Sequence, residues 1–413
     1  MSDFIKHYSQ YLTSNTLPIG NSLPIAKGEG IYFWDCDGKK YIDFSSQTLN
    51  LLLGQCHPAI VDAVVDQAKT LTFASSRFGT VQYFKTVEKI AEIAPSGLKR
   101  VNIKMCDGSD ANETSVKIAR KYTGKTGIIS FHNAHTGQTT QTIQLRGYGR
   151  DPRTLAGNTE DVVFVHTPKY KVKGDYKDTL KEISRVIKHH GNIAAILVDP
   201  IMVNAGVLVT DETKSYLQAL NSIANEYSVL FILDENQSFG WVPNLFAAKY
   251  FELSPDIITL GKGLSGGHPL AGVLVTEKLK DVLDYNEADF TNGGHALSCA
   301  AAYATLSILQ SVDFHIEEKE NVIRKALEEL QNIACVKFQI RGIGLIHCIE
   351  FEDNTTMSSD KLAENIFNKA LEKGLFIRRY NNKLVLKPPI IVTKEQIEET
   401  FSILKDVIGG IKK

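Results

Sequence analysis

The chain has 413 residues, 43% hydrophobic and 23% charged, so it can bury a sizeable core and form more than one domain. Its 46 basic and 47 acidic side chains give a formal net charge of -1, which argues against nucleic acid or an anionic membrane as a partner. The N-terminus lacks the features of a signal peptide, and no apolar run reaches the roughly 18 to 20 residues of a membrane span. We therefore expect a cytoplasmic protein.

The six cysteines form no Cys-x-x-Cys pair, which argues against a zinc site and a disulfide framework. We expect them to be small buried apolar residues.

Strand and helix patterns alternate along the chain. Residues 30–44 predict a hairpin around the turn Asp37-Gly38, and a helical pattern begins after His57-Pro58. Short apolar runs then alternate with helical stretches, which predicts an α/β fold with a mostly parallel sheet covered by helices. The expected strands are 126–130, 162–165, 194–198, 229–233, 256–260 and 270–275.

The pattern changes after Ala300, where a long helical stretch leads into a mixed region that ends in an amphipathic helix from Lys394. This change predicts a second, smaller α+β domain. We expect residues 1–54 to join that small domain, residues 55–300 to form the large domain and residues 301–413 to complete the small one.

Charged residues follow several predicted strands, at the edge where open α/β sheets bind ligands. They are Asp199, Asp234 and Lys262, the last between Gly261 and Gly263. A lysine there can form a Schiff base with an aldehyde cofactor, and an aspartate can keep a pyridine nitrogen protonated. Together they suggest pyridoxal phosphate chemistry, although a solvated lysine and a turn aspartate are the plain alternatives.

A phosphate needs backbone N–H donors, and residues 108–113 supply them before a helical pattern. Gly108 and Ser109 are the candidates, with a capped helix as the alternative. Gln237 could donate to the phenolic oxygen of the cofactor.

Ordered matches over nearly the whole chain resemble the class-III aminotransferases, a fold-type I pyridoxal phosphate family that includes the ornithine and 4-aminobutyrate aminotransferases. They are residues 28–35, 53–58, 108–113, 234–240, 255–263 and 341–345, with Pro388-Pro389. The resemblance implies a seven-stranded large domain and a small domain built from both termini.

The resemblance also implies roles for individual residues. Lys262 would carry pyridoxal 5′-phosphate as the internal aldimine, Asp234 would pair with the pyridinium, and Gln237 would lie beside the phenolic oxygen. Gly108 and Ser109 would form the phosphate cup, and His135 would stack on the ring where most relatives carry Phe or Tyr. Thr291 would reach the phosphate of the partner subunit in a homodimer with shared sites.

Other positions depart from the family. Gln138 stands where glutamate-using relatives commonly have an arginine, Asn204 replaces a gate glutamate, and Val385 replaces its arginine partner. We therefore expect poor use of 2-oxoglutarate. Arg378, Arg379 or Lys387 could compensate, although solvated side chains are the simpler expectation.

The chain is thus predicted to be an aminotransferase that moves an amino group between an amine or amino acid and a keto or aldehyde acceptor by a ping-pong mechanism. A racemase, epimerase or aminomutase on the same fold would need a second proton donor, for which Tyr32, His135 and Tyr170 are candidates. Ser265 lies in a Gly-x-Ser-x-Gly string, but His268-Pro269 and a strand follow instead of a helix, which disfavours a serine hydrolase. No metal-ligand spacing is present.

Overall fold

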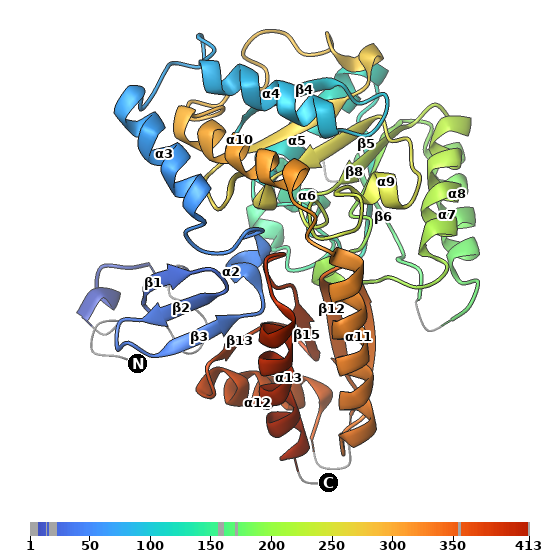
Figure 1. The fold of residues 1–413 in the computed structure, drawn as a ribbon. Coiled ribbons are helices and arrows are strands. Elements are labelled where there is room, and N and C mark those ends of the chain that lie inside the picture. Colours follow the sequence, from blue (N-terminus) through green and yellow to red (C-terminus); the bar gives the residue numbers. More distant parts are fainter. Residues whose placement is uncertain are drawn as a thin grey trace.

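A seven-stranded sheet forms the centre of the upper body in Figure 1, in the order β4-β10-β9-β8-β7-β5-β6. The computed structural model describes residues 7–13, 15, 23–155, 161–169, 172–353 and 357–411. Strands β6, β5, β7, β8 and β9 are parallel, whereas β10 is antiparallel to both of its neighbours. The seven strands are β4 (Arg100–Met105), β5 (Gly127–Phe131), β6 (Val162–Val165), β7 (Ile193–Val198), β8 (Leu230–Asp234), β9 (Ile257–Leu260) and β10 (Ala271–Val275).

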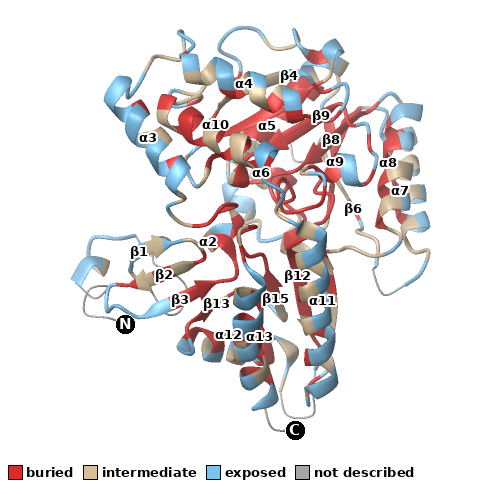
Figure 2. Cartoon of the chain, viewed as in Figure 1, coloured by how far each residue is buried: buried red, intermediate tan, exposed pale blue. Residues whose placement is uncertain are grey.

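Helices cover this sheet, so the predicted fold class is confirmed. Every residue of β5, β7, β8, β9 and β10 is buried, as expected for strands with both faces covered, and Figure 2 shows them as the buried centre of the body. The helices of this part are α3 (Pro58–Thr70), α4 (Val81–Ile93), α5 (Gly108–Thr123), α6 (Thr140–Leu145), α7 (Tyr176–His190), α8 (Thr213–Glu226), α9 (Ala247–Tyr250) and α10 (Ala296–Ser311). Short 3-10 turns are η2 (Pro152–Thr154), η4 (Val203–Ala205), η5 (Lys262–Ser265) and η6 (Glu277–Leu279).

Two smaller sheets form the lower body. One has the order β1-β2-β3-β13 and the other β11-β12-β15-β14. Their strands are β1 (Ile25–Glu29), β2 (Tyr32–Asp35), β3 (Lys40–Asp43), β11 (Phe338–Ile343), β12 (Ile346–Phe351), β13 (Leu375–Phe376), β14 (Arg378–Tyr380) and β15 (Lys383–Leu386). The accompanying helices are α2 (Ser46–Leu49), α11 (Ile316–Ile333), α12 (Ser359–Glu372) and α13 (Lys394–Gly409).

The predicted hairpin is present, because β2 and β3 pair as antiparallel neighbours. Strand β3 also pairs in parallel with β13, so the N-terminal segment shares a sheet with residues from the last fifth of the chain. This pairing agrees with a small domain built from both termini. The domain boundaries themselves stay predictions, and residue 300 lies inside α10.

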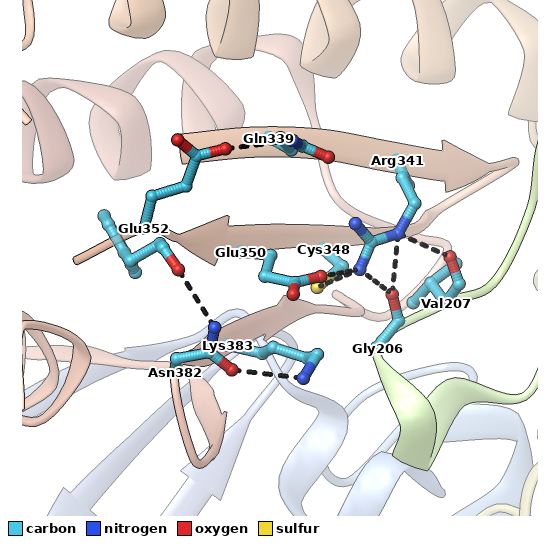
Figure 3. A network of polar contacts seen from close by, with 10 residues as sticks. Gly206, Val207, Gln339, Arg341, Cys348, Glu350, Glu352, Asn382 and Lys383 are labelled. Carbon is cyan, nitrogen blue, oxygen red and sulfur yellow. Dashed lines mark hydrogen bonds and ion pairs between the residues drawn. The ribbon is translucent and has the colours of Figure 1, made fainter. Parts of the chain in front are cut away.

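The buried side chain of Arg341 links the lower body to the connection between β7 and α8 (Figure 3). The Arg341 guanidinium lies 2.7 Å from the Glu350 carboxylate and also donates to the carbonyl oxygens of Gly206 and Val207. These carbonyls belong to the turn that contains Asn204. Arg341 therefore fixes that turn against the small sheet.

The six cysteines are free, as predicted. The expectation that all are buried is wrong for Cys36, Cys56 and Cys335, which are exposed. In the described part of the chain, we find no helix with the length and apolar character needed to cross a membrane.

Candidate active site

A cavity of about 770 Å³ opens where β8 and β9 end and α5 begins. Six of the seven residues with predicted roles line it: Gly108, Ser109, His135, Asp234, Gln237 and Lys262. The structure therefore brings together segments that lie more than 150 residues apart in the chain. It also adds lining residues to which the sequence analysis gave no role, namely Asn112, Arg146, Tyr148, Asn236 and Tyr380.

Lys262 lies two residues after β9, with its side chain in this cavity. Its φ of 34° is left-handed, which costs a residue with a Cβ on the order of 1 to 3 kcal/mol and is seen most often at functional sites. Burial lowers the pKa of Lys262, and the negative charge of Asp234 opposes that shift. A lysine with a lowered pKa holds its proton less tightly and is a better nucleophile.

The glycines on either side of Lys262 are closely packed against other side chains. A Cβ on Gly261 would lie 2.5 Å from Asn236 Oδ1, and one on Gly263 would lie 2.8 Å from the Trp241 ring. The close packing of Asn236 and Trp241 therefore leaves no space for a larger residue at either position.

Asp234 ends β8 and is buried, with 4% of its surface exposed. Its Oδ2 accepts a hydrogen bond of 2.7 Å from Asn112 Nδ2, and its Oδ1 accepts bonds from the backbone N–H and the Nδ2 of Asn236. This network holds the carboxylate in one orientation beside the cavity. A buried charge that faces a ligand site needs such support.

The N-terminus of α5 has a carboxylate of its own. Asp107 caps the helix and accepts hydrogen bonds of 2.8 Å from both the N–H and the hydroxyl of Ser109. A phosphate would use the same two donors. The Asp107 carboxylate therefore occupies the position at the predicted cup where a bound phosphate would lie. Because Asp107 is exposed, its side chain can turn toward solvent when a phosphate binds.

A second glycine closes this end of the cavity. A Cβ on Gly137 would lie 2.5 Å from Thr142 Oγ1 and 2.8 Å from Ser109 Oγ, and the φ of Gly137 is +139°. The residue beside the cup must therefore be glycine.

Two buried acceptors in the cavity have no hydrogen-bond partner among the described residues. They are Asn236 Oδ1 and Gln237 Oε1, and the Gln237 Nε2 donates to Asn204 Oδ1 over 3.1 Å. Exchange of the oxygen and nitrogen in both the Gln237 and the Asn204 amide would keep the hydrogen bond between them and leave a Gln237 N–H free for a phenolic oxygen. Unpaired buried polar atoms, the anion-accepting helix end and Lys262 together fit pyridoxal phosphate.

His135 lies half-buried in the cavity, and its Nδ1 is 2.8 Å from the Tyr148 hydroxyl. Burial lowers the pKa of His135 to about 4, with the charge of Lys262 as the next contribution. The ring is therefore neutral at pH 7. A neutral imidazole is the form that can lie against an aromatic cofactor without adding charge.

The positions that depart from the family lie in different surroundings. Gln138 and Asn204 line the cavity, whereas Val385 is fully buried in β15. Asn204 Nδ2 lies 3.3 Å from both the Tyr148 and the Tyr380 hydroxyl. Asn204, predicted to replace the gate glutamate, is thus part of a hydrogen-bond network of neutral side chains.

The three cations that could compensate for the missing arginines also lie in different surroundings. Arg379 pairs with Asp360 at 2.9 Å, whereas Arg378 lines the cavity. Lys387 is fully buried, so the expectation that it is solvated is wrong: its Nζ donates to the Leu49 carbonyl and lies 3.5 Å from the centroid of the Trp241 ring. Burial holds the pKa of Lys387 well below its usual value.

The remaining candidates lie elsewhere. Asp199 accepts hydrogen bonds from the N–H groups of Ile201 and Met202 and lines a different cavity. Thr291 is exposed and does not line the cavity of Lys262. Ser265 is buried and donates to the His268 carbonyl, and a turn follows it where a nucleophile elbow would need a helix, so the serine hydrolase hypothesis finds no support.

Similar proteins agree with this chemistry. The acetylornithine aminotransferase of Methanocaldococcus jannaschii is 32% identical, with 96% of each chain covered, and that of Caldanaerobacter subterraneus is 34% identical, with 99% of this chain and all of the relative covered. The taurine:2-oxoglutarate aminotransferase of Bifidobacterium kashiwanohense, solved with pyridoxal phosphate and glutamate, superposes with a TM-score of 0.89 at 28% identity, covering 98% of this chain and 97% of that one. The family model for class-III aminotransferases matches residues 16–408, and the chain belongs to this family of pyridoxal phosphate-dependent enzymes.

Proposed function

We propose that Lys262 is the residue that attaches pyridoxal phosphate in this aminotransferase and that Asp234 pairs with its ring nitrogen. When bound, the cofactor supplies an aldehyde carbon and a ring that withdraws electrons from the substrate carbon. The observation that carries this proposal is the position of both side chains in one cavity, at the ends of the adjacent strands β8 and β9. Lys262 then also moves the substrate proton, for which its lowered pKa suits it.

The phosphate binds at the start of α5 in this proposal. The N–H and hydroxyl of Ser109, with the adjacent backbone of Gly108, donate to it once Asp107 turns away. The positive end of the helix dipole adds to the attraction. His135 covers one side of the cofactor ring as a neutral group, and Gln237 lies beside the phenolic oxygen.

A homodimer is supported by an exposed apolar surface near Thr291. Phe73, Phe78, Val81 and Phe84 are each at least 46% exposed, which is unusual for large apolar side chains so close in sequence. The Phe73 ring lies 6.0 Å from the ring of His295, four residues after Thr291. We therefore place Thr291 at the edge of a subunit interface, where it contacts the phosphate of the partner subunit.

The substrates we propose are an amine or amino acid as donor and a keto acid or aldehyde as acceptor. Relatives act on acetylornithine and taurine by name, but Gln138 and Asn204 put neutral amides in the cavity of this chain. A neutral amide forms a weaker hydrogen bond to a carboxylate than a guanidinium does. Glutamate and 2-oxoglutarate should therefore be poor substrates.

A half-reaction experiment separates amino transfer from racemisation. The holoenzyme is mixed with a panel of amines and amino acids, and the products are analysed after a single turnover. Transfer predicts one equivalent of aldehyde or keto product and recovery of the starting enzyme on addition of a keto acid. Inversion of the substrate without such a product would favour the racemase or epimerase.

Three residues were considered as the second proton donor that a racemase needs. Tyr32 hydrogen-bonds with Glu399 and Gln396 and does not line the cavity. Tyr170 lies outside the described residues. His135 lines the cavity, but its pKa of about 4 leaves it without the extra proton at neutral pH, which favours transfer.

A further inference from the structure

Arg378 is a cation in the cavity of Lys262 to which the reaction chemistry assigns no role. It lies in β14, opposite Val385 of β15, and is half-buried where it lines the cavity. Its positive charge contributes to the lowering of the pKa of both Lys262 and His135. Arg378 therefore acts on the same enclosed space as these two groups.

Within the described part of the chain, the side chain of Arg378 has neither an ion pair nor a hydrogen bond to another residue. Its guanidinium lies 5.4 Å from the centroid of the Tyr380 ring, which leaves its N–H groups unused. Other partly buried arginines are engaged: Arg146 donates to the carbonyls of Tyr148 and Gly149, and Arg379 pairs with Asp360. A guanidinium taken partly out of water gains most from an anion with two oxygens in one plane.

The described residues that line the cavity do not supply that anion. Its two carboxylates there are held elsewhere, Asp234 by Asn112 and Asn236, and Asp107 by Ser109. A ligand is the remaining source of negative charge.

Hydroxyl groups lie beside Arg378 in position to add to such a site. Tyr148 and Tyr380 both line the cavity, and the side chain of Asn204 lies 3.3 Å from each of their hydroxyls. Asn204 belongs to the turn that Arg341 fixes. The neutral donors around Arg378 are thus held in place before a ligand arrives.

We propose that Arg378 binds the carboxylate of the substrate, with the Tyr148 and Tyr380 hydroxyls beside it, and that the enzyme prefers amines carrying one carboxylate. This inference rests on the proposed function, because the amine must meet the cofactor at Lys262 while the carboxylate meets Arg378. It makes Arg378 a specificity-determining residue. It also agrees with poor use of glutamate, since the second carboxylate would find the amide of Gln138 instead of a cation.

The test compares 5-aminovalerate with pentylamine, which lacks the carboxylate, in half-reactions of the holoenzyme. Arg378→Gln removes the charge, and Arg379→Gln is the matched control because that neighbour pairs with Asp360 outside the cavity lining. For Arg378→Gln we expect kcat/KM for 5-aminovalerate to fall about 10- to 100-fold, mostly through KM, with little change for pentylamine. Arg379→Gln should change neither.

A binding measurement keeps the inference testable even if none of the amines reacts. Calorimetric titration of the holoenzyme with pentanoate and with pentanamide should show that pentanoate binds more tightly to the wild type and loses this advantage in Arg378→Gln. Equal binding of the two compounds to the wild type, or an unchanged preference in Arg378→Gln, would overturn the role of Arg378. Failure of every amine to react, with pentanoate binding intact, would instead count against the proposed donors.

Discussion

Asn112 connects the two strands that deliver the reactive side chains. Its Nδ2 donates to Asp234 at the end of β8 over 2.7 Å, and its Oδ1 accepts from Thr259 Oγ1 of β9 over 2.8 Å. Since Asn112 belongs to the first turns of α5, it also ties both strands to the helix that forms the phosphate cup. One buried amide thus aligns three parts of the cavity.

We expect Asn112→Ala to damage both stability and activity. The change removes the hydrogen-bond donor to the buried Oδ2 of Asp234, which costs about 1 to 3 kcal/mol of unfolding free energy. Turnover should fall more than tenfold because Asp234 is no longer held in one orientation. Thermal unfolding and steady-state rates check this, with Asn225→Ala on the exposed side of α8 as the control. An Asn112→Ala enzyme as stable and active as the control would contradict the role assigned to this amide.

Gly137→Ala should weaken cofactor binding. The new Cβ would overlap with Ser109 and Thr142, so the residues of the phosphate cup would have to move. Gly97→Ala is a matched control, because Gly97 also has a positive φ but has open space around its Cβ position. Equilibrium dialysis of pyridoxal phosphate should give a higher Kd for Gly137→Ala than for the control. Equal Kd values for the two variants would contradict the prediction, because only Gly137 is crowded by residues of the cup.

Asp107→Asn should strengthen cofactor binding. The asparagine can still cap α5, but its side chain no longer repels the phosphate with a negative charge. We expect a Kd for pyridoxal phosphate at least about threefold lower than that of the wild type, with a smaller gain at high salt. A higher Kd would mean that Asp107 supports the cofactor rather than competing with it.

His347 should make the protein sensitive to acid. It is buried, with its Nε2 2.9 Å from the Gly344 carbonyl, and burial lowers its pKa to about 4 from the usual 6.5. Between these values the unfolded chain binds a proton that the folded chain does not, so stability is full above pH 6.5 and falls as the pH drops toward 4. The loss is on the order of 3 kcal/mol.

His347→Gln tests this, because glutamine keeps an N–H donor but does not titrate. Thermal midpoints of both proteins are measured from pH 7.5 to 4.5, and the variant should lose less stability over this range. Parallel curves for the two proteins would assign the acid sensitivity to other groups.

Much of the fold could be predicted because buried strands leave a clear pattern. The apolar runs of β5 to β10 and the amphipathic helix from Lys394 match the structure to within a few residues. Strand β4 was missed, because Arg100 and Lys104 interrupt its apolar residues at the exposed edge of the sheet. Edge strands carry polar side chains where central ones do not, so composition alone did not mark it.

The site was predictable where a short motif carries the chemistry and unpredictable where distant segments meet. Lys262 and Asp234 follow strands, a position that sequence alone indicates. The bond of Asn112 to Asp234 and the burial of Lys387 against Trp241 join segments more than 100 residues apart and could not be foreseen. Only tertiary structure distinguishes the free Arg378 from its paired neighbour Arg379.

The central claim is that Lys262 holds the cofactor, and reductive labelling tests it most directly. The holoenzyme is treated with borohydride, digested and mapped by mass spectrometry. We expect the pyridoxyl phosphate group on Lys262 alone, and no labelled peptide when Lys262→Ala is treated in the same way. Label on another lysine of the wild type, such as the buried Lys387, would contradict the account.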